Sequence, residues 1–350
     1  MCLAGSATAQ GFAGLGTDAS GFALPDRDHI YEFPRDHGAH PAFRIEWWYL
    51  TATLSGADGK DYGVQWTLFR SALKPEEAAG WDSPQLWMAH AAATSATGHY
   101  VDERMARGGV GGAGVTAAPF VAWIDDWAMT STAPPDKDAL SRLSLSASGT
   151  DFAYDLTLQA DGPLVFHGDR GYSVKSREGQ ASHYYSQPHY RVTGTLELPD
   201  GPVVVEGDGW LDREWSSQPL SEDQTGWDWF SLGFDDGTKL MAFRLRDAGN
   251  GFRSGTWITR HGQALPLADE QIVVTPLAET EINGRAVPTR WHVDITSRGV
   301  SVEVAALNPQ SWMDTSFPYW EGPVRISGSH SGRGYLEMTG YAPEVEESED

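Results

Sequence analysis

Carboxylates that share a strand face with apolar residues are the groups of this sequence best suited to chemistry. Along residues 46–54, the alternation of an extended strand places Glu46 on the same face as Trp48 and Leu50. A carboxylate on such a face is either paired with a cation or lies in a cavity with a raised pKa. The second case makes Glu46 a candidate acid or base, and the first makes it half of a buried ion pair with an arginine such as Arg70. The sequence leaves both interpretations open.

Acidic residues also alternate along residues 208–215. Carboxylates in line repel one another unless cations or solvent lie between them. At a cleft they could supply a general acid and a general base, whereas on the surface they would form an ordinary acidic edge. One face carries Asp208, Trp210, Asp212 and Glu214, and the other carries Leu211, Arg213 and Trp215.

Two further segments add candidates of the same kind. Asp228 shares the apolar face of its predicted strand with Phe230, as Glu46 does with Trp48 in its own strand. Tyr184 and Tyr185 place hydroxyl groups directly after His183. Such groups can polarise a substrate or orient water. The alternative for the tyrosines is a packed aromatic corner.

Motifs for metals and nucleotides are weak. Asp36, His37 and His40 lie within five residues and could ligate a metal, but Gly38 and Pro41 make this segment a loop whose histidines could equally cap or line a cleft. Residues 109–114 match G-x-G-x-x-G but have no helical pattern after them, so a flexible loop is the better interpretation. We expect no metal and no cofactor.

Composition narrows the class of partner. The 350 residues contain 25 Lys+Arg and 48 Asp+Glu, a net charge of −23 that argues against nucleic acid and an anionic membrane surface. No apolar stretch approaches the 18 residues of a membrane span. The 15 tryptophans suggest large rigid walls, in a core or around an apolar or sugar-like ligand. With Cys2 as the single cysteine, a disulfide framework and a cysteine-based zinc site are excluded.

The N-terminus resembles the end of a secretory signal. Residues 7–9 form an Ala-Thr-Ala cleavage pattern, although an ordinary flexible terminus is an alternative. We expect residues 1–32 to be the N-terminal segment of an exported protein, periplasmic or secreted in a bacterium.

The elements that must position these side chains are predicted to be strands. Short β-branched and aromatic runs are separated by Gly and Asp-Gly turns, and sustained helical periodicity is missing. Three hairpins are expected, over residues 46–70, 143–159 and 226–246, the last being the clearest. The fold class is therefore all-β, a sandwich or barrel. The length favours two β-domains, 33–205 and 206–345, in a chain expected to be a monomer.

Several of these motifs, taken in order, resemble the AttH/CrtC-type family. They are Glu46-Trp47-Trp48-Tyr49, Tyr184-Tyr185-Ser186-x-Pro188, residues 209–217 (GWLDREWSS) and residues 226–230 (GWDWF), and the resemblance covers roughly residues 33 to 340. The family consists of lipocalin-like proteins often described as predicted secreted hydrolases, and it includes carotenoid 1,2-hydratases. The resemblance implies two lipocalin-like (calycin) β-barrel or sandwich domains with an apolar ligand cavity near their junction.

The resemblance does not carry over the hydratase residues. The carotenoid hydratases have His where this chain has Arg213, and Tyr and Asp where it has 240–242 (Leu-Met-Ala), so that only Trp215 is shared. Arg is always charged and cannot do the proton work of a histidine near neutral pH. Hydration of a carotenoid by the same residues is therefore not expected.

The sequence thus predicts a hydrolase or hydratase acting on a hydrophobic molecule, isoprenoid or lipid-like, by carboxylate acid–base chemistry. In this hypothesis Glu46 or Asp228 protonates the substrate or activates water, while Asp212 and Glu214 hold Arg213 and the water. The aromatic walls and substrate contacts are assigned to Tyr184, Trp48, Trp215, Tyr185 and Trp229, with Arg213 as a further substrate contact. Two alternatives stay open: a non-catalytic lipocalin-like carrier, and a carbohydrate-active protein, because tryptophan platforms and paired carboxylates also suit sugars.

Overall fold

The computed structural model describes residues 19–218, 220–221 and 223–343 of the chain. The predicted cleavage pattern at residues 7–9 lies outside these ranges. Within them, regular structure consists of β-strands and short 3₁₀ helices, which confirms the all-β prediction. The 3₁₀ helices are η2 (Arg35–His37), η3 (Gly80–Asp82), η4 (Ala139–Ser141), η5 (Asp269–Gln271) and η6 (Thr296–Arg298). The described part of the chain has no helix long and apolar enough to cross a membrane.

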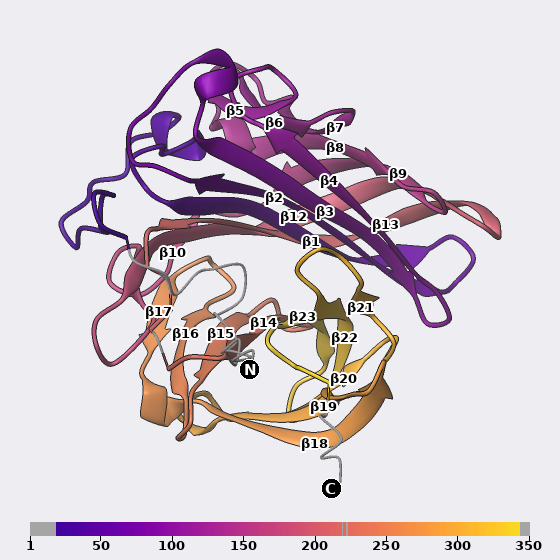
Figure 1. Cartoon of the computed structure of the whole chain (residues 1–350). Coiled ribbons are helices and arrows are strands. Elements are labelled where there is room, and N and C mark those ends of the chain that lie inside the picture. The colour runs from indigo at the N-terminus through magenta and orange to yellow at the C-terminus, as the bar shows by residue number, and fades with distance from the viewer. Residues whose placement is uncertain (1–18, 219, 222, 344–350) are drawn as a thin grey trace, which may run out of the picture.

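The first of two sheets contains the strands up to residue 216, in the order β4-β3-β2-β1-β13-β12-β9-β8-β7-β6-β5, with β10 and β11 paired to β12. It curls into a nearly closed barrel, in which β4 also contacts β6 (Figure 1). We call this unit the N-terminal barrel. Its strands are β1 (Ile45–Gly56), β2 (Asp61–Ala72), β3 (Gln85–Ser95), β4 (His99–Arg107), β5 (Ala113–Ala117), β6 (Phe120–Ile124), β7 (Trp127–Ser131), β8 (Arg142–Ser148), β9 (Ala153–Ala160), β10 (Val165–Phe166), β11 (Tyr172–Val174), β12 (Ala181–Leu198) and β13 (Gly201–Ser216).

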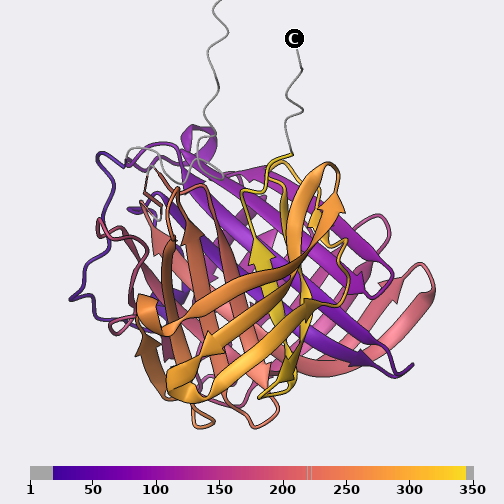
Figure 2. The same cartoon turned by 90° about the horizontal axis from the view of Figure 1, so that it is seen from below.

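The second sheet has the order β17-β16-β15-β14-β23-β22-β20-β19-β18, with β21 paired to β22, and forms an open half-barrel that we call the C-terminal half-barrel. Viewed from below, it lies across the N-terminal barrel (Figure 2). Its strands are β14 (Gly226–Phe234), β15 (Lys239–Arg246), β16 (Phe252–Ile258), β17 (Ala264–Leu267), β18 (Val273–Ile282), β19 (Arg285–Ile295), β20 (Val300–Ala306), β21 (Trp312–Met313), β22 (Tyr319–Gly328) and β23 (Gly332–Met338). The two units are the lipocalin-like pair that was expected.

The change of sheet comes later in the chain than the predicted boundary at 205/206. That boundary falls inside β13, which pairs with the whole of β1, from Val205 opposite Gly56 to Ser216 opposite Ile45. A strand within a continuous ladder cannot be divided between two domains. The sheets are therefore separated between Ser216 and Gly226.

Part of the predicted N-terminal segment 1–32 is built into the first unit. The Tyr31 hydroxyl donates to the Gly171 carbonyl over 3.0 Å, and the backbone nitrogen of Asp26 donates to His183 over 3.2 Å. Residues 19–32 therefore cover one end of the N-terminal barrel.

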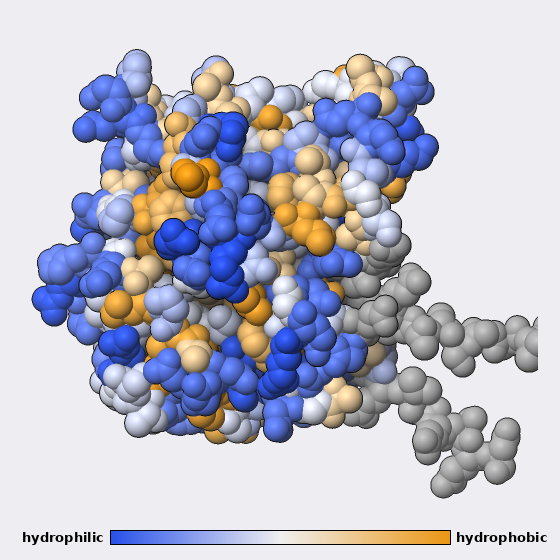
Figure 3. Space-filling model, turned by 90° about the vertical axis from the view of Figure 1, so that its left-hand side faces the viewer, coloured by the Kyte–Doolittle hydropathy of each residue, from blue (hydrophilic) through white to orange (hydrophobic). Residues whose placement is uncertain are grey.

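Strand alternation gives each sheet two different faces. One face of the N-terminal barrel is a core containing Trp48, Leu50 and Trp66, and one face of the half-barrel is a core containing Phe230 and Trp291. The opposite faces of the two sheets meet in a third apolar cluster, at the junction. On the outside, apolar patches lie between hydrophilic areas (Figure 3).

Candidate active site

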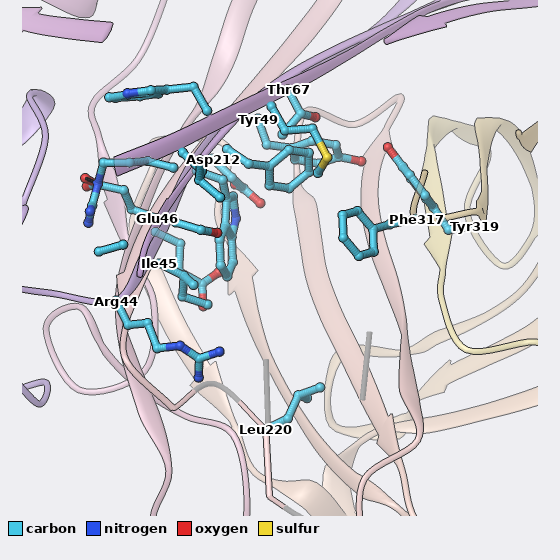
Figure 4. Close-up of a pocket in the computed structure, with 18 of the residues that line it drawn as sticks. Arg44, Ile45, Glu46, Tyr49, Thr67, Asp212, Leu220, Phe317 and Tyr319 are labelled. Atoms are coloured by element: carbon cyan, nitrogen blue, oxygen red, sulfur yellow. Dashed lines mark hydrogen bonds and ion pairs between the residues drawn. The ribbon is translucent and has the colours of Figure 1, made fainter. Parts of the chain in front are cut away.

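A cavity of about 790 Å³ lies where the two sheets face each other. Tyr49 and Asp212 approach it from the N-terminal barrel, and Phe317 and Tyr319 from the half-barrel (Figure 4). Its size falls in the range of small-molecule sites. The aromatic side chains that line it are Phe22, Trp47, Tyr49, Phe69, Trp87, Trp227, Trp229, Phe243, Phe317 and Tyr319.

Asp212 is a buried carboxyl group on the cavity wall. Its Oδ2 accepts a hydrogen bond from the Tyr184 hydroxyl at 2.5 Å, and its Oδ1 accepts from Trp210 Nε1 at 2.6 Å and from the Ser186 hydroxyl. Burial, together with the negative charge of Glu214, raises the pKa of Asp212 to about 7 despite these donors. Asp212 can therefore either donate or accept a proton near neutral pH.

Glu214 follows two residues later on the same face of β13. Its Oε1 lies 2.8 Å from Lys175 Nζ and accepts a hydrogen bond from the Ser182 hydroxyl. The ammonium group of Lys175 also lies 4.4 Å from the centre of the Phe243 ring. This ion pair borders the cavity.

Glu337 is a third carboxyl group of the cavity and was missed by the sequence analysis. It is half-buried on β23, directly opposite Trp229 in the ladder, and accepts a hydrogen bond from Trp227 Nε1. Burial, with the charges of Asp212 and Glu214, raises the pKa of Glu337 to about 7. At neutral pH a large fraction of Glu337 is therefore protonated.

A fourth carboxyl group, Glu321, lies behind Tyr49. The Tyr49 hydroxyl donates to Glu321, whose neighbour in the ladder is Glu337. Burial and the charge of Glu337 raise the pKa of Glu321 well above its usual range. The neutral, protonated form of Glu321 is therefore favoured at the back of the cavity wall.

A buried chain of polar groups supports Asp212 from behind. His167 Nε2 lies 2.6 Å from the hydroxyl of Ser186, which in turn donates to Asp212. His167 Nδ1 lies 2.9 Å from the hydroxyl of Thr256, on a strand of the half-barrel. The chain thus connects both sheets to the same carboxyl group.

Glu46 borders the cavity, but its carboxylate is occupied within the protein. It is paired with Arg70 and Arg213 and accepts a hydrogen bond from the backbone nitrogen of His40 at 2.8 Å. Burial alone would raise the pKa of Glu46, but the two arginines outweigh it and hold that pKa well below its usual range. The ion-pair interpretation is therefore the one that the structure supports, and Glu46 is not placed to donate a proton.

Asp228 faces the interior of the half-barrel, away from the cavity. Its carboxylate oxygens contact Arg246 and, at 2.8 Å, Arg244. The Tyr341 hydroxyl donates to it over 2.9 Å. The predicted acid–base role of Asp228 is wrong, because its carboxylate, like that of Glu46, is held by two arginines, and because its strand face belongs to the half-barrel core.

Some of the predicted aromatic residues line the cavity, and others lie in the core of the N-terminal barrel. Trp229 lines the cavity, and its Nε1 donates to the Tyr184 hydroxyl over 3.2 Å. Three other predicted contacts, Trp48, Tyr185 and Trp215, belong to the core of the N-terminal barrel instead.

Arg213 lies among these core aromatics. Its guanidinium carbon is 3.9 Å from the centre of the Trp48 ring and 5.0 Å from that of Trp215. The prediction that Asp212 and Glu214 hold Arg213 is wrong for their carboxylates, because adjacent residues of a strand point to opposite faces. Only the backbone carbonyl of Glu214 accepts a hydrogen bond from Arg213, over 3.2 Å. The partner of Arg213 is Glu46.

The histidines of residues 36–40 are held by neighbouring protein groups. His37 Nδ1 lies 2.7 Å from the Tyr185 hydroxyl, and the His40 ring stacks on Trp215 at 3.9 Å. Over the described residues, no group of three or more His, Cys, Asp or Glu side chains is arranged to hold a metal ion.

The comparisons with known proteins agree with this architecture. The chain is similar over 92% of its length to the whole of an AttH protein from Nitrosomonas europaea, with 31% identity and a TM-score of 0.80. Kievitone hydratase from Nectria haematococca has the same fold at 16% identity, with 90% of this chain and 94% of that one covered and a TM-score of 0.66. No curated protein matches the sequence. The AttH-like family model matches residues 24–341, and the chain therefore belongs to the AttH-like family.

Proposed function

We propose that the protein is an enzyme that adds water to, or uses water to cleave, a hydrophobic small molecule bound in the junction cavity. One observation carries the proposal: Asp212 and Glu337, two carboxyl groups with pKa values raised to about 7, line the same aromatic-walled cavity. A general acid is most effective when its pKa lies near the working pH. A carboxyl group in a cavity whose pKa is strongly shifted by burial and by a charged neighbour is a candidate catalytic group.

Glu337 is the best placed acid of the pair. It is half-buried, and a single hydrogen-bond donor, Trp227, is seen on its carboxyl group. Asp212 instead accepts three hydrogen bonds and is almost fully buried. In the proposed reaction Glu337 protonates the substrate, and Asp212 and Glu214 stabilise the positive charge that develops on it.

The class of substrate follows from the walls. Aromatic rings form much of the lining, and the two carboxyl groups with a raised pKa, Asp212 and Glu337, lie on β13 and β23. A molecule with a long apolar body and one reactive double bond, alcohol or ester fits this distribution. Water addition is also consistent with the fold, because a protein named as a hydratase shares it.

The test combines binding and turnover. Binding is measured with the neutral fluorophore N-phenyl-1-naphthylamine, and turnover with a panel of isoprenoid alkenes, alcohols and fatty acyl esters in H₂¹⁸O, where mass spectrometry detects ¹⁸O in the product. Glu337→Gln should keep fluorophore binding and lose turnover by roughly 10²–10⁴-fold. Glu279→Gln, an exposed position on β18, is the matched control and should be unaffected. A Glu337→Gln variant as active as the wild type would remove this carboxyl group from the mechanism, and binding without any turnover would identify a carrier.

A further inference from the structure

A second chain of polar groups reaches the cavity from the outside of the molecule. His90 is fully buried on β3, with Nδ1 3.0 Å from the Tyr319 hydroxyl and Nε2 3.1 Å from Glu103 Oε1. Glu103 lies opposite His90 on β4, while Tyr319 begins β22 of the other sheet. The three groups therefore form a Tyr–His–Glu sequence across the junction.

The proton positions in this chain follow from the chemistry of its members. The bond from His90, followed by that from Ser316, holds the pKa of Glu103 below its usual range, so Glu103 is ionised and can only accept. Burial lowers the pKa of His90, which is therefore neutral near pH 7. Its one ring proton must lie on Nε2, toward Glu103, and Nδ1 must accept the proton of the Tyr319 hydroxyl.

The two ends of the chain lie in different environments. The Glu103 side chain is 22% exposed, and the backbone nitrogen and hydroxyl of Ser316 hold it at 3.1 and 2.8 Å. Tyr319 lines the cavity and is hydrogen-bonded to Glu321. Three connected groups therefore link the partly exposed Glu103 to the cavity.

We propose that Tyr319, His90 and Glu103 form a proton-transfer chain in which Tyr319 takes the proton of the attacking water and His90 receives the proton that Tyr319 releases. This inference rests on the proposed function. It identifies the base that removes a proton from the attacking water, a role that the proposed reaction had not assigned. Asp212 and Glu337 supply the acid of the reaction, while Tyr319, which lies on the strand next to that of Glu337, supplies the base through the chain.

The step balances without a further reactant. Glu337 gives one proton to the substrate, and the water oxygen forms the new bond at the electron-deficient carbon. As the water loses a proton to the Tyr319 oxygen, the Tyr319 hydroxyl proton moves to His90 Nδ1, so no free phenolate forms. The Glu103 carboxylate stabilises the imidazolium and passes its Nε2 proton to solvent. The neutral ring then exchanges its remaining proton from Nδ1 to Nε2 before the next turnover, and Glu337 takes one proton from solvent.

The groups around the chain favour proton transfer from Tyr319 toward His90 and Glu103. His90 faces the carboxylate of Glu103 from β4, and the uncharged rings of Phe69 from β2 and of Tyr319 pack against it. Tyr319 is surrounded by Glu321, Glu337 and Tyr335, all acidic groups. Burial and Glu321 raise the pKa of Tyr319 well above 10, so the hydroxyl stays protonated between turnovers.

The first test does not depend on turnover. In ¹⁵N-labelled protein, long-range ¹H–¹⁵N spectra distinguish the two neutral tautomers of a histidine, and the resonance of His90 is assigned from its loss in the His90→Gln variant. The proposal expects the Nε2–H tautomer between pH 6 and 8. An Nδ1–H tautomer would overturn it, because that nitrogen could then not accept the tyrosine proton.

The second test uses turnover of whichever panel compound the wild type converts. His90→Gln and Tyr319→Phe should each lower kcat by about 10²-fold or more with little change in KM, since neither can pass a proton on. His99→Gln, a second histidine of the same barrel that bonds to Thr94, is the control and should keep full activity. If these variants had a normal kcat, the proton-transfer chain would be refuted, but the proposed role of Glu337 as the acid would not be affected. A wild type without turnover would refute the proposed function, and the tautomer of His90 would still decide whether the chain exists.

Discussion

Asp212 and Arg213 are adjacent in β13 but take part in two different structures. Asp212 points into the junction cavity, where its pKa rises to about 7, whereas Arg213 points into the N-terminal barrel and pairs with Glu46. The pleat of a single strand therefore separates the titrating carboxyl group from the permanent ion pair. A shift of β13 by one residue would exchange the two and destroy both.

The ion pairs of Glu46 predict a large loss of stability on neutralisation. Glu46→Gln leaves Arg70 and Arg213 buried without their carboxylate, and it should lower the free energy of unfolding by roughly 3–5 kcal/mol, measured by urea denaturation. Binding of the neutral fluorophore should survive in the folded variant. Asp169→Asn, which removes an exposed pair with Arg27, is the control and should change the midpoint little. Equal stability of the two variants would contradict the ion-pair role.

Protonation of Glu46 in acid should lower the free energy of unfolding in the same way as Glu46→Gln does. The pKa of Glu46 is lowered in the folded state, so its contribution to stability is present above its unfolded value of about 4.5 and is lost as the pH falls through the folded value. The difference in unfolding free energy between the wild type and Glu46→Gln should therefore be constant from pH 6 to 8 and shrink below about pH 4.5. A difference that persists undiminished to pH 2 would contradict this assignment.

Much of the fold could be predicted from local sequence because hairpins carry local signals. The expected turn at Asp236-Gly237 joins β14 to β15, and the expected strands at 46–54 and 62–70 lie within β1 and β2. The end of the N-terminal barrel could not be placed in this way. Gly, Pro and Ser concentrate over residues 199–219, which suggests a boundary between domains, yet the chain turns tightly after Leu198 and continues as β13 as far as Ser216.

The site was only partly predicted because its carboxyl groups lie on unexpected faces. The prediction looked for a carboxylate among apolar neighbours, which in these sheets means a domain core, and so it selected Glu46 and Asp228. The cavity is formed by the opposite faces, where polar residues look like an ordinary outer surface until a second sheet covers them. Asp212 and Glu214 were included for their spacing. Glu337 lies between the apolar residues Leu336 and Met338, a pattern typical of a strand with one buried face. The strand that contains it was not predicted, so this carboxyl group was missed.

Glu337 predicts the opposite pH dependence from Glu46. Its pKa is raised from 4.5 to about 7 in the folded state, so the folded protein binds the proton more tightly than the unfolded chain. Stability from this group is complete below about pH 4.5 and is lost as the pH rises through 7. Glu337→Gln, which cannot ionise, should therefore be more stable than the wild type at pH 8 by on the order of 2 kcal/mol, with a smaller difference at pH 5. Thermal unfolding at both pH values measures this, and a larger gain at pH 5 would show that the sign is wrong.

Two tryptophans on opposite faces provide a matched test of where the ligand binds. Trp229 lines the cavity, whereas Trp48 is 1% exposed in the core of the N-terminal barrel. Trp229→Phe should weaken binding of N-phenyl-1-naphthylamine several-fold, because it removes an aromatic wall. Trp48→Phe should leave the affinity unchanged while lowering stability by about 1–3 kcal/mol. If Trp48→Phe alone weakened binding, the ligand would occupy the barrel interior, as in a single-domain lipocalin.

The last prediction concerns His167, which connects Asp212 to the half-barrel. Its burial lowers its pKa well below 6.5, so it is neutral and bridges Ser186 and Thr256 with one donating and one accepting nitrogen. His167→Phe leaves both hydroxyls without this partner and should cost about 1–3 kcal/mol of stability. The Ser186 hydroxyl, which lowers the pKa of Asp212, is then free to rotate away, so the titration of Asp212 followed by ¹³C NMR should move upward from pH 7 by about one pH unit or less. Thr256→Val removes only the far hydroxyl and should move this titration less than His167→Phe does. If His167→Phe destabilised the protein without moving the titration of Asp212, His167 would only hold the two sheets together and would not tune the carboxyl group in the cavity.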